Sequence, residues 1–183
     1  MKLGIYPGSF NPPHKGHKKV CDYLIKERII DKIIIVPTMN YWNKNNLSNL
    51  EDRINMLKYY ESDNISIDIE NNHLPYTIEL MEKLENKYLN DELYLIIGAD
   101  NIINFDKWKD YQKLLKYKII IMNRNNININ EYLYKYPNNK FIIINNFSCI
   151  DISSTNIRNK INTKYLDYNV LKYIKKRGLY ENL

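Results

Sequence analysis

Short apolar runs that alternate with helical periodicities constrain the fold of this chain more than any other feature. Five of these runs are rich in Ile, continuously apolar and bounded by residues that break regular structure, so they predict strands. They span residues 3–6, 32–36, 93–97, 117–122 and 141–144. Continuous apolarity is typical of parallel strands that are covered on both faces. Ile65, Ile67 and Ile69 instead alternate with polar residues, which predicts a more exposed strand.

Segments with helical spacing fill the gaps between these runs. Helices are expected from near His14, from a capping box at Ser48 and Glu51, from near Thr77, and over 109–115, 154–161 and 166–176. The second carries Leu50, Ile54 and Leu57 at core spacing, the last ends before Gly178, and residues 123–130 are expected to form a surface loop. The alternation predicts an α/β fold with a doubly wound, Rossmann-like parallel sheet, which binds ligands at the carboxyl ends of its strands. With no repeat visible, residues 1–183 are expected to form a single domain with a small C-terminal helical segment.

The composition limits how far surface patterns can be interpreted. Asn, Ile, Lys and Tyr account for 96 of the 183 residues, against the single alanine Ala99, and all four have A/T-rich codons. We attribute this to genomic base bias. The net charge of +6 comes from scattered lysines, so it indicates a solvated surface that also suits an anionic small molecule, and no nucleic-acid partner is expected.

Cysteine content and hydropathy point to a cytoplasmic protein. No stretch reaches the ~18–20 apolar residues of a membrane span, and the N-terminus lacks the apolar run of a signal peptide, so no membrane partner is expected. Two cysteines cannot form a disulfide framework. Cys21 and Cys149 are therefore expected to be buried, reduced thiols.

The strongest candidate for chemistry is the segment 8–17, Gly-Ser-Phe-Asn-Pro-Pro-His-Lys-Gly-His, directly after the first predicted strand. The two prolines fix the backbone entering the helix, and Gly16 removes a side chain from its first turn. Free N–H groups and the positive end of the helix dipole favour phosphate there. His14 and His17 share one face of that turn, where both can donate to a phosphate and stabilise charge as a bond to phosphorus breaks. Local helix capping and a zinc pair are the alternatives, although no carboxylate or thiol lies nearby at ligand spacing.

A second cluster, Ile-Ser-Ser-Thr-Asn-Ile-Arg, occupies residues 152–158. Ser153, Ser154 and Thr155 are good helix N-caps, and Arg158 can reach the same helix end because it follows Ser154 by four residues. Hydroxyls, free N–H groups and a guanidinium together form a second phosphate cradle. A plain helix cap is the alternative.

Together the two motifs resemble those of the nucleotidyltransferase superfamily, and within it the nicotinate/nicotinamide-mononucleotide adenylyltransferases. The resemblance covers nearly the whole chain, in order. Gly-x-Phe-x-Pro-x-His-x-Gly-His matches residues 8–17, and Ile-Ser-Ser-Thr-x-Ile-Arg matches residues 152–158. Further matches are Lys44, Arg53, Tyr76-Thr77, Gly98-Ala99-Asp100, Trp108 and Gly178-Leu179-Tyr180. The first and last motifs are shared with sister adenylyltransferases, whereas Trp108 with Tyr76 and Thr77 narrows the resemblance to pyridine nucleotides.

The resemblance implies a single nucleotidyltransferase domain that transfers AMP from ATP to nicotinate mononucleotide, or to the amide form, in NAD biosynthesis. Pyrophosphate is released by direct displacement, with Mg²⁺ accompanying ATP and no residue assigned as a metal ligand. Catalytic roles are implied for His14, His17, Lys44 and Arg158. ATP contacts are implied for Gly8, Ser9, Phe10, His14, His17, Gly98, Asp100, Ser153, Ser154, Thr155 and Arg158. Mononucleotide contacts are implied for Ser9, Phe10, Asn40, Lys44, Tyr76, Thr77, Trp108 and Arg124.

Other interpretations stay open at this point. By residue type alone, Trp108 also fits a core position, Arg53 a solvated helix face and Asp100 a helix N-cap. A pantetheine-phosphate adenylyltransferase and a non-catalytic nucleotide- or RNA-binding module are the rival functions, and the presence of His17 and Arg158 argues against the second. A homodimer is the base-rate expectation for a soluble enzyme. The choice between the acid and the amide mononucleotide is not decided by the sequence.

Overall fold

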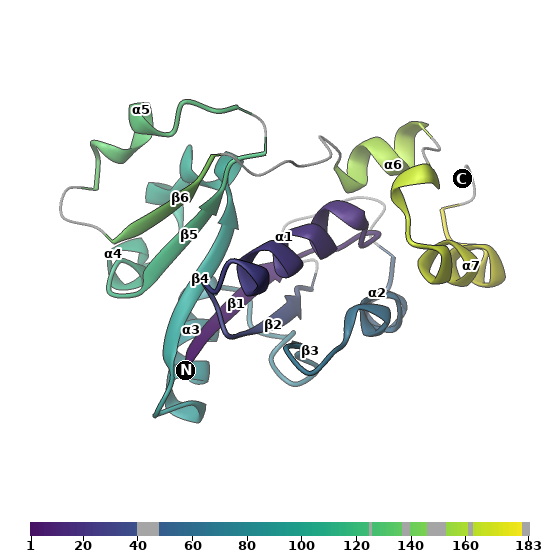
Figure 1. Ribbon diagram of the computed structural model, residues 1–183, viewed down its shortest axis with the longest axis horizontal. Helices are drawn as coiled ribbons and strands as arrows, with labels where there is room; N and C mark the ends of the chain where they lie inside the picture. Colours follow the sequence, from purple (N-terminus) through teal and green to yellow (C-terminus); the bar gives the residue numbers. More distant parts are fainter. Residues whose placement is uncertain (40–47, 125, 137–139, 146–152, 161–162, 181–183) are drawn as a thin grey trace.

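A computed structural model of the protein shows strands and helices alternating along the chain (Figure 1). It describes residues 1–39, 48–124, 126–136, 140–145, 153–160 and 163–180. The strands are β1 (Lys2–Gly8), β2 (Lys32–Pro37), β3 (Ile65–Ile67), β4 (Glu92–Gly98), β5 (Lys118–Met122) and β6 (Phe141–Ile144). The helices are α1 (Lys15–Lys26), α2 (Leu50–Leu57), α3 (Thr77–Lys87), α4 (Tyr111–Leu114), α5 (Asn130–Leu133), α6 (Ser154–Lys160) and α7 (Tyr168–Arg177). Each predicted strand is present, with bounds that differ by two residues at most.

All six strands pair in parallel, in the order β3-β2-β1-β4-β5-β6. The two central strands are β1 and β4, and Ile5 of β1 lies opposite Ile34 of β2 and Leu95 of β4. The chain winds from β1 to β3 in one direction and from β4 to β6 in the other, so the carboxyl ends of β1 and β4 flank a topological switch point. The predicted doubly wound, Rossmann-like sheet is confirmed, and its switch point is where such a fold binds ligands.

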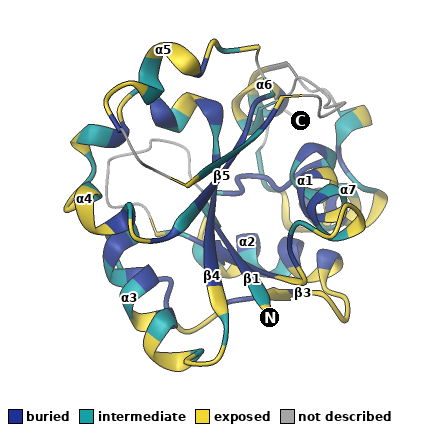
Figure 2. Cartoon of the chain, turned by 60° about the vertical axis from the view of Figure 1, so that its left-hand side comes forward, coloured by how far each residue is buried: buried dark blue, intermediate teal, exposed yellow. Residues whose placement is uncertain are grey.

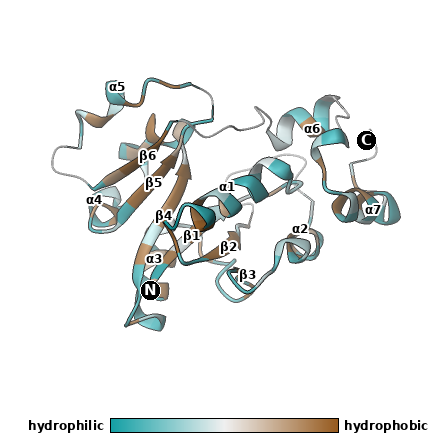
Figure 3. Ribbon diagram, in the orientation of Figure 1, coloured by the Kyte–Doolittle hydropathy of each residue, from teal (hydrophilic) through white to brown (hydrophobic). Residues whose placement is uncertain are grey.

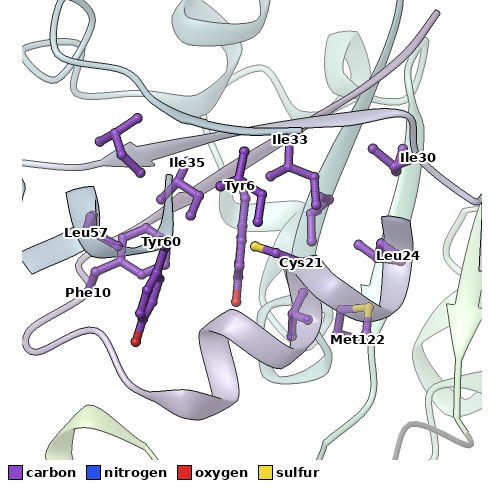
Figure 4. Close-up of a cluster of buried hydrophobic side chains, with 14 of the residues drawn as sticks. Tyr6, Phe10, Cys21, Leu24, Ile30, Ile33, Ile35, Leu57, Tyr60 and Met122 are labelled. Atoms are coloured by element: carbon purple, nitrogen blue, oxygen red, sulfur yellow. The ribbon is translucent and has the colours of Figure 1, made fainter. Parts of the chain in front are cut away.

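Helices cover both faces of the sheet, which explains why the strands are continuously apolar (Figures 2 and 3). Tyr6 of β1 faces one core together with residues of α1, α2 and α7, whereas Leu3 and Ile5 face a second core with residues of α3 and α4. Figure 4 shows part of the first core, with Cys21 of α1 among its members. Burial raises the pKa of the Cys21 thiol to about 12, so this thiol is inert and protonated, as predicted. Cys149 lies outside the described residues.

The start of α2 differs from the predicted capping box. Its N-cap is Asn49, whose side chain accepts the Asp52 N–H at 2.7 Å. Ser48 instead donates its N–H and its hydroxyl to Oδ1 of Asn11, at 3.1 and 2.9 Å. Asn is as good an N-cap as Ser, so Ser48 can serve a tertiary contact without leaving the helix end unsatisfied.

The buried face of α2 is also more polar than its spacing predicts. Its buried side chains are Asp52, Arg53, Met56 and Leu57, whereas Leu50 and Ile54 are only half-buried. The cause is the C-terminal helix α7, because Asp52 accepts the Tyr173 hydroxyl at 2.7 Å and Nε of Arg177 at 3.0 Å. This polar contact joins α2 and α7, which lie side by side in Figure 1.

One strand prediction and one loop prediction are corrected. The strand expected to be more exposed has both Ile65 and Ile67 buried. Strand β3 ends at Ile67, and Ile69 is 63 % exposed because the chain leaves the sheet after Asp68. The segment 123–130 is not wholly a surface loop. Asn123 is buried, with its amide donating to the Ile127 carbonyl at 2.8 Å, and Ile129 packs into the core. In the part of the chain described here, no helix is long and apolar enough to cross a membrane.

Replacing Asp52 by Asn is expected to lower the free energy of unfolding at pH 7 by roughly 1–2 kcal/mol, because the charged acceptor of Tyr173 and Arg177 is lost. Burial raises the pKa of Asp52, but the hydrogen bonds from Tyr173 and Arg177 outweigh it and hold that pKa below its ordinary value. A lowered folded-state pKa gives stability that is present above the unfolded pKa and lost as the pH falls through the folded one.

The difference in the free energy of unfolding between the wild type and Asp52→Asn should therefore become smaller below about pH 4. Urea denaturation at pH 7 and pH 3 measures it, with Asp63→Asn at an exposed position as the matched control. An equal difference at both pH values would contradict the assignment of the charge on Asp52.

Candidate active site

A cavity of about 720 Å³ opens at the carboxyl ends of β1 and β4. Its walls come from the loops that follow β1, β2, β4 and β5 and from the start of α3. The residues from the resemblance that line it are Gly8, Ser9, Phe10, His17, Tyr76, Thr77, Gly98, Asp100, Trp108 and Arg124. This is the position at which a doubly wound sheet binds its ligand.

The two histidines of the first motif cap α1 and each other. His14 is the N-cap, and its Nδ1 accepts the Gly16 N–H at 3.1 Å. Nδ1 of His17 accepts the His14 N–H at 3.1 Å, and the two rings stack with centroids 3.7 Å apart. His14 is fully buried, whereas His17 is half-buried and lines the cavity. Capping and ligand binding are therefore compatible, because capping uses Nδ1 and leaves Nε2 of both rings for another partner.

Both imidazoles are neutral at physiological pH. Burial, aided by the charge of Arg124, lowers the pKa of His14 to about 3. Burial, His14 and Arg124 together hold the pKa of His17 well below its ordinary range. A neutral ring whose Nδ1 accepts a hydrogen bond carries its proton on Nε2. Each histidine therefore offers one N–H donor, and the positive charge beside them is that of Arg124.

Arg124 follows β5 and reaches the beginning of α1. Its Nη1 is buried and has no hydrogen-bond partner among the described residues, and the same holds for Nε2 of His14. A Cβ at Gly16 would lie 3.8 Å from this Nη1 and 2.9 Å from the His14 ring, so the glycine leaves room for both. Two buried donors without acceptors at one helix N-terminus are suited to an anion. The structure thus places Arg124 beside the histidine pair, although the resemblance assigned it to the mononucleotide.

The second motif docks onto the loop of the first, about 140 residues earlier in the chain. The Ser154 hydroxyl donates to the Pro12 carbonyl at 2.8 Å, and Nη1 of Arg158 donates to the Asn11 carbonyl. Nη2 of Arg158 donates to the Thr155 hydroxyl at 3.1 Å. Ser153 accepts the N–H of Asn156 at 3.1 Å, so this serine is a helix cap, as its alternative interpretation proposed.

Arg53 is a buried anchor and does not lie on a solvated helix face. Its side chain is 1 % exposed and donates to three carbonyls, at 2.8 Å to Ser9 after β1, and at 2.6 Å to Thr38 and 3.1 Å to Ser48 in the connection from β2 to α2. Burial lowers the pKa of Arg53, but a guanidinium remains charged under all ordinary conditions. Arg53 therefore ties the loop after β1 to the loop after β2 at the mouth of the cavity.

Trp108 and the start of α3 form another wall of the cavity. Trp108 is half-buried, and its ring packs on Phe105 with centroids 5.2 Å apart, so one part of it belongs to the core and another lines the cavity. Tyr76 is the N-cap of α3 and makes no side-chain cap hydrogen bond, and Thr77 is the first helical residue. Nζ of Lys109 lies 4.2 Å from the centre of the Tyr76 ring.

Gly98 and Asp100 meet at the end of β4. A Cβ at Gly98 would lie only 2.6 Å from Oδ1 of Asp100, so glycine is required for the carboxylate to fold back over the strand end. The N-cap of the following 3-10 turn is Gly98, and Asp100 is exposed on the cavity wall. The interpretation of Asp100 as a simple N-cap is therefore wrong.

Some site residues lie outside the described part of the chain, and others were missed. Asn40 and Lys44 fall in 40–47, and Ile152 falls in 146–152, so the structure does not describe them. Sequence reasoning gave no separate role to Asn11, which lies within the first motif, and interpreted Ser48 only as part of a capping box. Lys109 also lines the cavity and had no motif to mark it.

Comparison with known proteins agrees with this geometry. Residues 5–160 match the model of the family described as Cytidylyltransferase-like. The chain belongs to this family. A protein of Fusobacterium nucleatum named "Probable nicotinate-nucleotide adenylyltransferase" is 39% identical over 90% of this chain and 89% of its own length. A protein of Borreliella burgdorferi with the same name is 36% identical over 98% and 97%.

A solved structure extends the likeness to three dimensions. Nicotinic acid mononucleotide adenylyltransferase of Plasmodium falciparum, complexed with NaAD, superposes with a TM-score of 0.82 at 27% sequence identity. The match covers 98% of this chain and 97% of the other. Within the cytidylyltransferase-like family, the chain therefore groups with the nicotinate-nucleotide adenylyltransferases.

In this member of the family, His14 and His17 are expected to stay neutral from pH 5 to pH 8, because burial and Arg124 disfavour their charged forms. Nitrogen-15 NMR of the free protein checks this, and both rings should show a protonated Nε2 and an accepting Nδ1. The signals of His14 and His17 are compared in the same spectra with the signal of His73, whose ring is exposed. Protonation of either motif histidine within that range would contradict the assignment.

Proposed function

We propose that this chain transfers the adenylyl group of ATP to nicotinate mononucleotide, giving nicotinate adenine dinucleotide and pyrophosphate in NAD biosynthesis. The observation that carries the proposal is the pair of buried donors, Nε2 of His14 and Nη1 of Arg124, without acceptors at the N-terminus of α1. Such donors are costly unless a ligand satisfies them, and phosphate oxygens are suited to both. The names of the relatives and of the solved neighbour support the same reaction.

The reaction is a direct displacement. An oxygen of the mononucleotide 5′-phosphate forms a bond to the α-phosphorus of ATP, while the bond from that phosphorus to the bridging oxygen breaks and pyrophosphate leaves. Since no protein nucleophile takes part, catalysis consists of positioning and charge stabilisation. Nε2–H of His14 and of His17, with the guanidinium of Arg124, stabilises the ATP phosphates. Arg158 and the hydroxyl of Thr155 hold the departing pyrophosphate, together with Lys44. Ser154 gives its hydroxyl proton to the Pro12 carbonyl and so keeps this helix end beside the first motif.

The remaining residues define two nucleoside subsites. Gly8, Ser9 and Phe10 line the join between the nucleotides, and Gly98 and Asp100 meet the adenosine ribose, whose two hydroxyls a carboxylate can accept. Ser153 holds the start of α6 at the pyrophosphate side. Asn40, Tyr76, Thr77 and Trp108 take the mononucleotide, and the flat face of Trp108 suits its cationic pyridine ring.

Mg²⁺ enters with ATP as part of the substrate. This ion keeps several waters and binds substrate phosphates together with one or two carboxylates. Within the described residues no three His, Cys, Asp or Glu side chains cluster, and Asp100, a carboxylate on the cavity wall, is given to the ribose in this proposal, so the ion would be held by the substrate phosphates and water. The metal supplies additional charge neutralisation at the phosphates, while the chain's own donors orient them.

The acid form of the mononucleotide is the better substrate in this proposal. The pyridine side of the cavity carries Lys107 and the N-terminus of α3, whose N-cap Tyr76 makes no side-chain cap bond, whereas Lys109 is paired with Glu79 at 2.8 Å. Positive charge and free N–H groups favour a carboxylate over a neutral amide.

We further propose that residues 1–183 act as one domain, in the cytoplasm, as a homodimer.

The experiment that tests the function is release of pyrophosphate by the purified chain with ATP, Mg²⁺ and each mononucleotide in turn. We expect turnover with both and a higher kcat/KM for the acid. His17→Ala should lower kcat by about 10²–10³, because one donor to the developing charge is removed. His73→Ala, at an exposed position, is the matched control.

A second variant separates catalysis from helix capping. His17→Asn retains a side-chain oxygen that can accept the His14 N–H but not the donor at the position of Nε2, so it should lose turnover like His17→Ala while melting near the wild type. No pyrophosphate release by the wild type, with either mononucleotide, would overturn the proposed function. Near-normal turnover of both variants would remove His17 from the mechanism.

Trp108→Ala should raise KM for the mononucleotide by roughly tenfold and leave KM for ATP within about twofold, because the pyridine stacking surface is lost while the proposed ATP contacts are kept. Trp108→Phe keeps an aromatic face and should retain most of the affinity. Initial rates with each substrate varied separately provide the measurement. An unchanged mononucleotide KM in Trp108→Ala would return the residue to a purely structural role beside Phe105.

A further inference from the structure

The C-terminal Gly178-Leu179-Tyr180 follows α7, and the proposed reaction gives it no role. Gly178 ends the helix in the left-handed conformation with a φ of 60°, and Leu179 then packs against the core that contains α1 and α2. This turn directs Tyr180 back toward the loop of the first motif. Tyr180 itself has a φ of 56°, a conformation that a tyrosine adopts only when its surroundings impose it.

The hydroxyl of Tyr180 ends on Asn11, inside the first motif. Asn11 is 3 % exposed, and its Oδ1 accepts hydrogen bonds from the Tyr180 hydroxyl and from the N–H of Ser48 at 3.1 Å. The Ser48 hydroxyl lies 2.9 Å from this Oδ1 and 2.9 Å from the Tyr180 oxygen. Segments that are far apart in the sequence thus converge on one buried side-chain oxygen.

The main chain of Asn11 completes the connection to the site. Its carbonyl accepts Nη1 of Arg158, the residue that carries the positive charge of the second motif. The orientation of the Asn11 peptide therefore determines where this guanidinium is held. Because the side chain of Asn11 is fixed by Tyr180 and Ser48, the same contacts fix its peptide.

We propose that Tyr180 is a positioning residue of the transfer reaction, acting through Asn11 to hold the guanidinium of Arg158 where the departing pyrophosphate needs it. The proposal rests on the proposed function for the identity of the anion. Tyr180 does not touch the reacting atoms in this account, so its effect is on the placement of Arg158 and not on the chemistry directly.

Burial keeps the Tyr180 hydroxyl protonated, so it can act as a hydrogen-bond donor. Burial raises the pKa of Tyr180 to about 12, against the opposite effects of the Ser48 hydrogen bond and of the charges on Arg158 and Arg53. The proton therefore stays on the phenol at physiological pH and is available to Asn11.

Docking of α7 does not depend on this hydroxyl. The helix is attached by Val170 and Ile174 in the core and by Tyr173 and Arg177 on Asp52. Tyr173 lies on α7, and its hydroxyl donates to Asp52 of α2 and not to Asn11. It therefore offers a matched comparison for Tyr180. Loss of the Tyr173 hydroxyl should affect stability, whereas loss of the Tyr180 hydroxyl should affect the phosphate site.

The test compares Tyr180→Phe with Tyr173→Phe. For Tyr180→Phe we expect kcat to fall roughly three- to tenfold and the dissociation constant for magnesium pyrophosphate to rise by a similar factor, as for one lost hydrogen bond. KM for the mononucleotide should stay within about twofold of wild type, because the pyridine side is untouched. Tyr173→Phe should keep kcat and pyrophosphate affinity while melting at a lower temperature. Initial rates, calorimetric titration and thermal melting provide the three readouts.

Two results would overturn the proposal. One is a Tyr180→Phe protein with wild-type kcat and pyrophosphate affinity, and the other is an equal loss of kcat in Tyr173→Phe. If Tyr180→Phe fails to fold, Asn11→Ala takes its place, because it removes the acceptor of the Tyr180 hydroxyl and keeps the carbonyl that accepts Arg158, and it should show the same loss of pyrophosphate affinity. Because titration with pyrophosphate needs no turnover, an inactive wild type would reject the proposed reaction while the role of Tyr180 in the anion site was still decided.

Discussion

The amide groups at the start of α1 need acceptors, and the way in which they obtain them governs the site. Nδ1 of His14 and Nδ1 of His17 each accept a backbone N–H, so the backbone selects the tautomer of both rings. Nε2 then carries the proton, and burial prevents a second one from binding. The result is a pair of neutral, fixed donors beside the permanent charge of Arg124. Attraction for phosphate thus does not depend on a histidine titrating near physiological pH.

The fold places this donor pair at the topological switch point of the sheet. The carboxyl ends of β1 and β4 diverge there, and the chain must hold several irregular loops in register around the gap. It does so with side chains that donate to main-chain oxygens: Arg53 to three carbonyls in two loops, Ser154 to Pro12 and Arg158 to Asn11. The phosphate loop is consequently secured from both α2 and the C-terminal segment.

Sequence patterns predict the elements of this fold well and its tertiary polar contacts poorly. The strands were recognisable because burial on both faces produces uninterrupted Ile-rich runs, and the first motif was recognisable because Gly, Pro and His stand out in a chain dominated by Asn, Ile, Lys and Tyr. The capping box at Ser48 and the solvated face, which was the alternative interpretation of Arg53, were wrong for a common reason. Both residues satisfy partners that are distant in sequence, Asn11 for the first and Ser9 and Thr38 for the second, and local spacing carries no information about such partners. Lys44 and Asn40 remain predictions.

The contacts of Arg53 have a consequence for how such a protein can change. Every hydrogen bond that this side chain makes in the described structure ends on a carbonyl oxygen, an atom that each amino acid possesses. Substitution of Ser9, Thr38 or Ser48 therefore leaves an acceptor in place, provided that the backbone keeps its path. Substitutions in the loops around the cavity can therefore change the shape of the substrate site, while the guanidinium of Arg53 keeps the loops at the same spacing. Arg53 thus keeps the loop backbones in place while the side chains that line the cavity can vary.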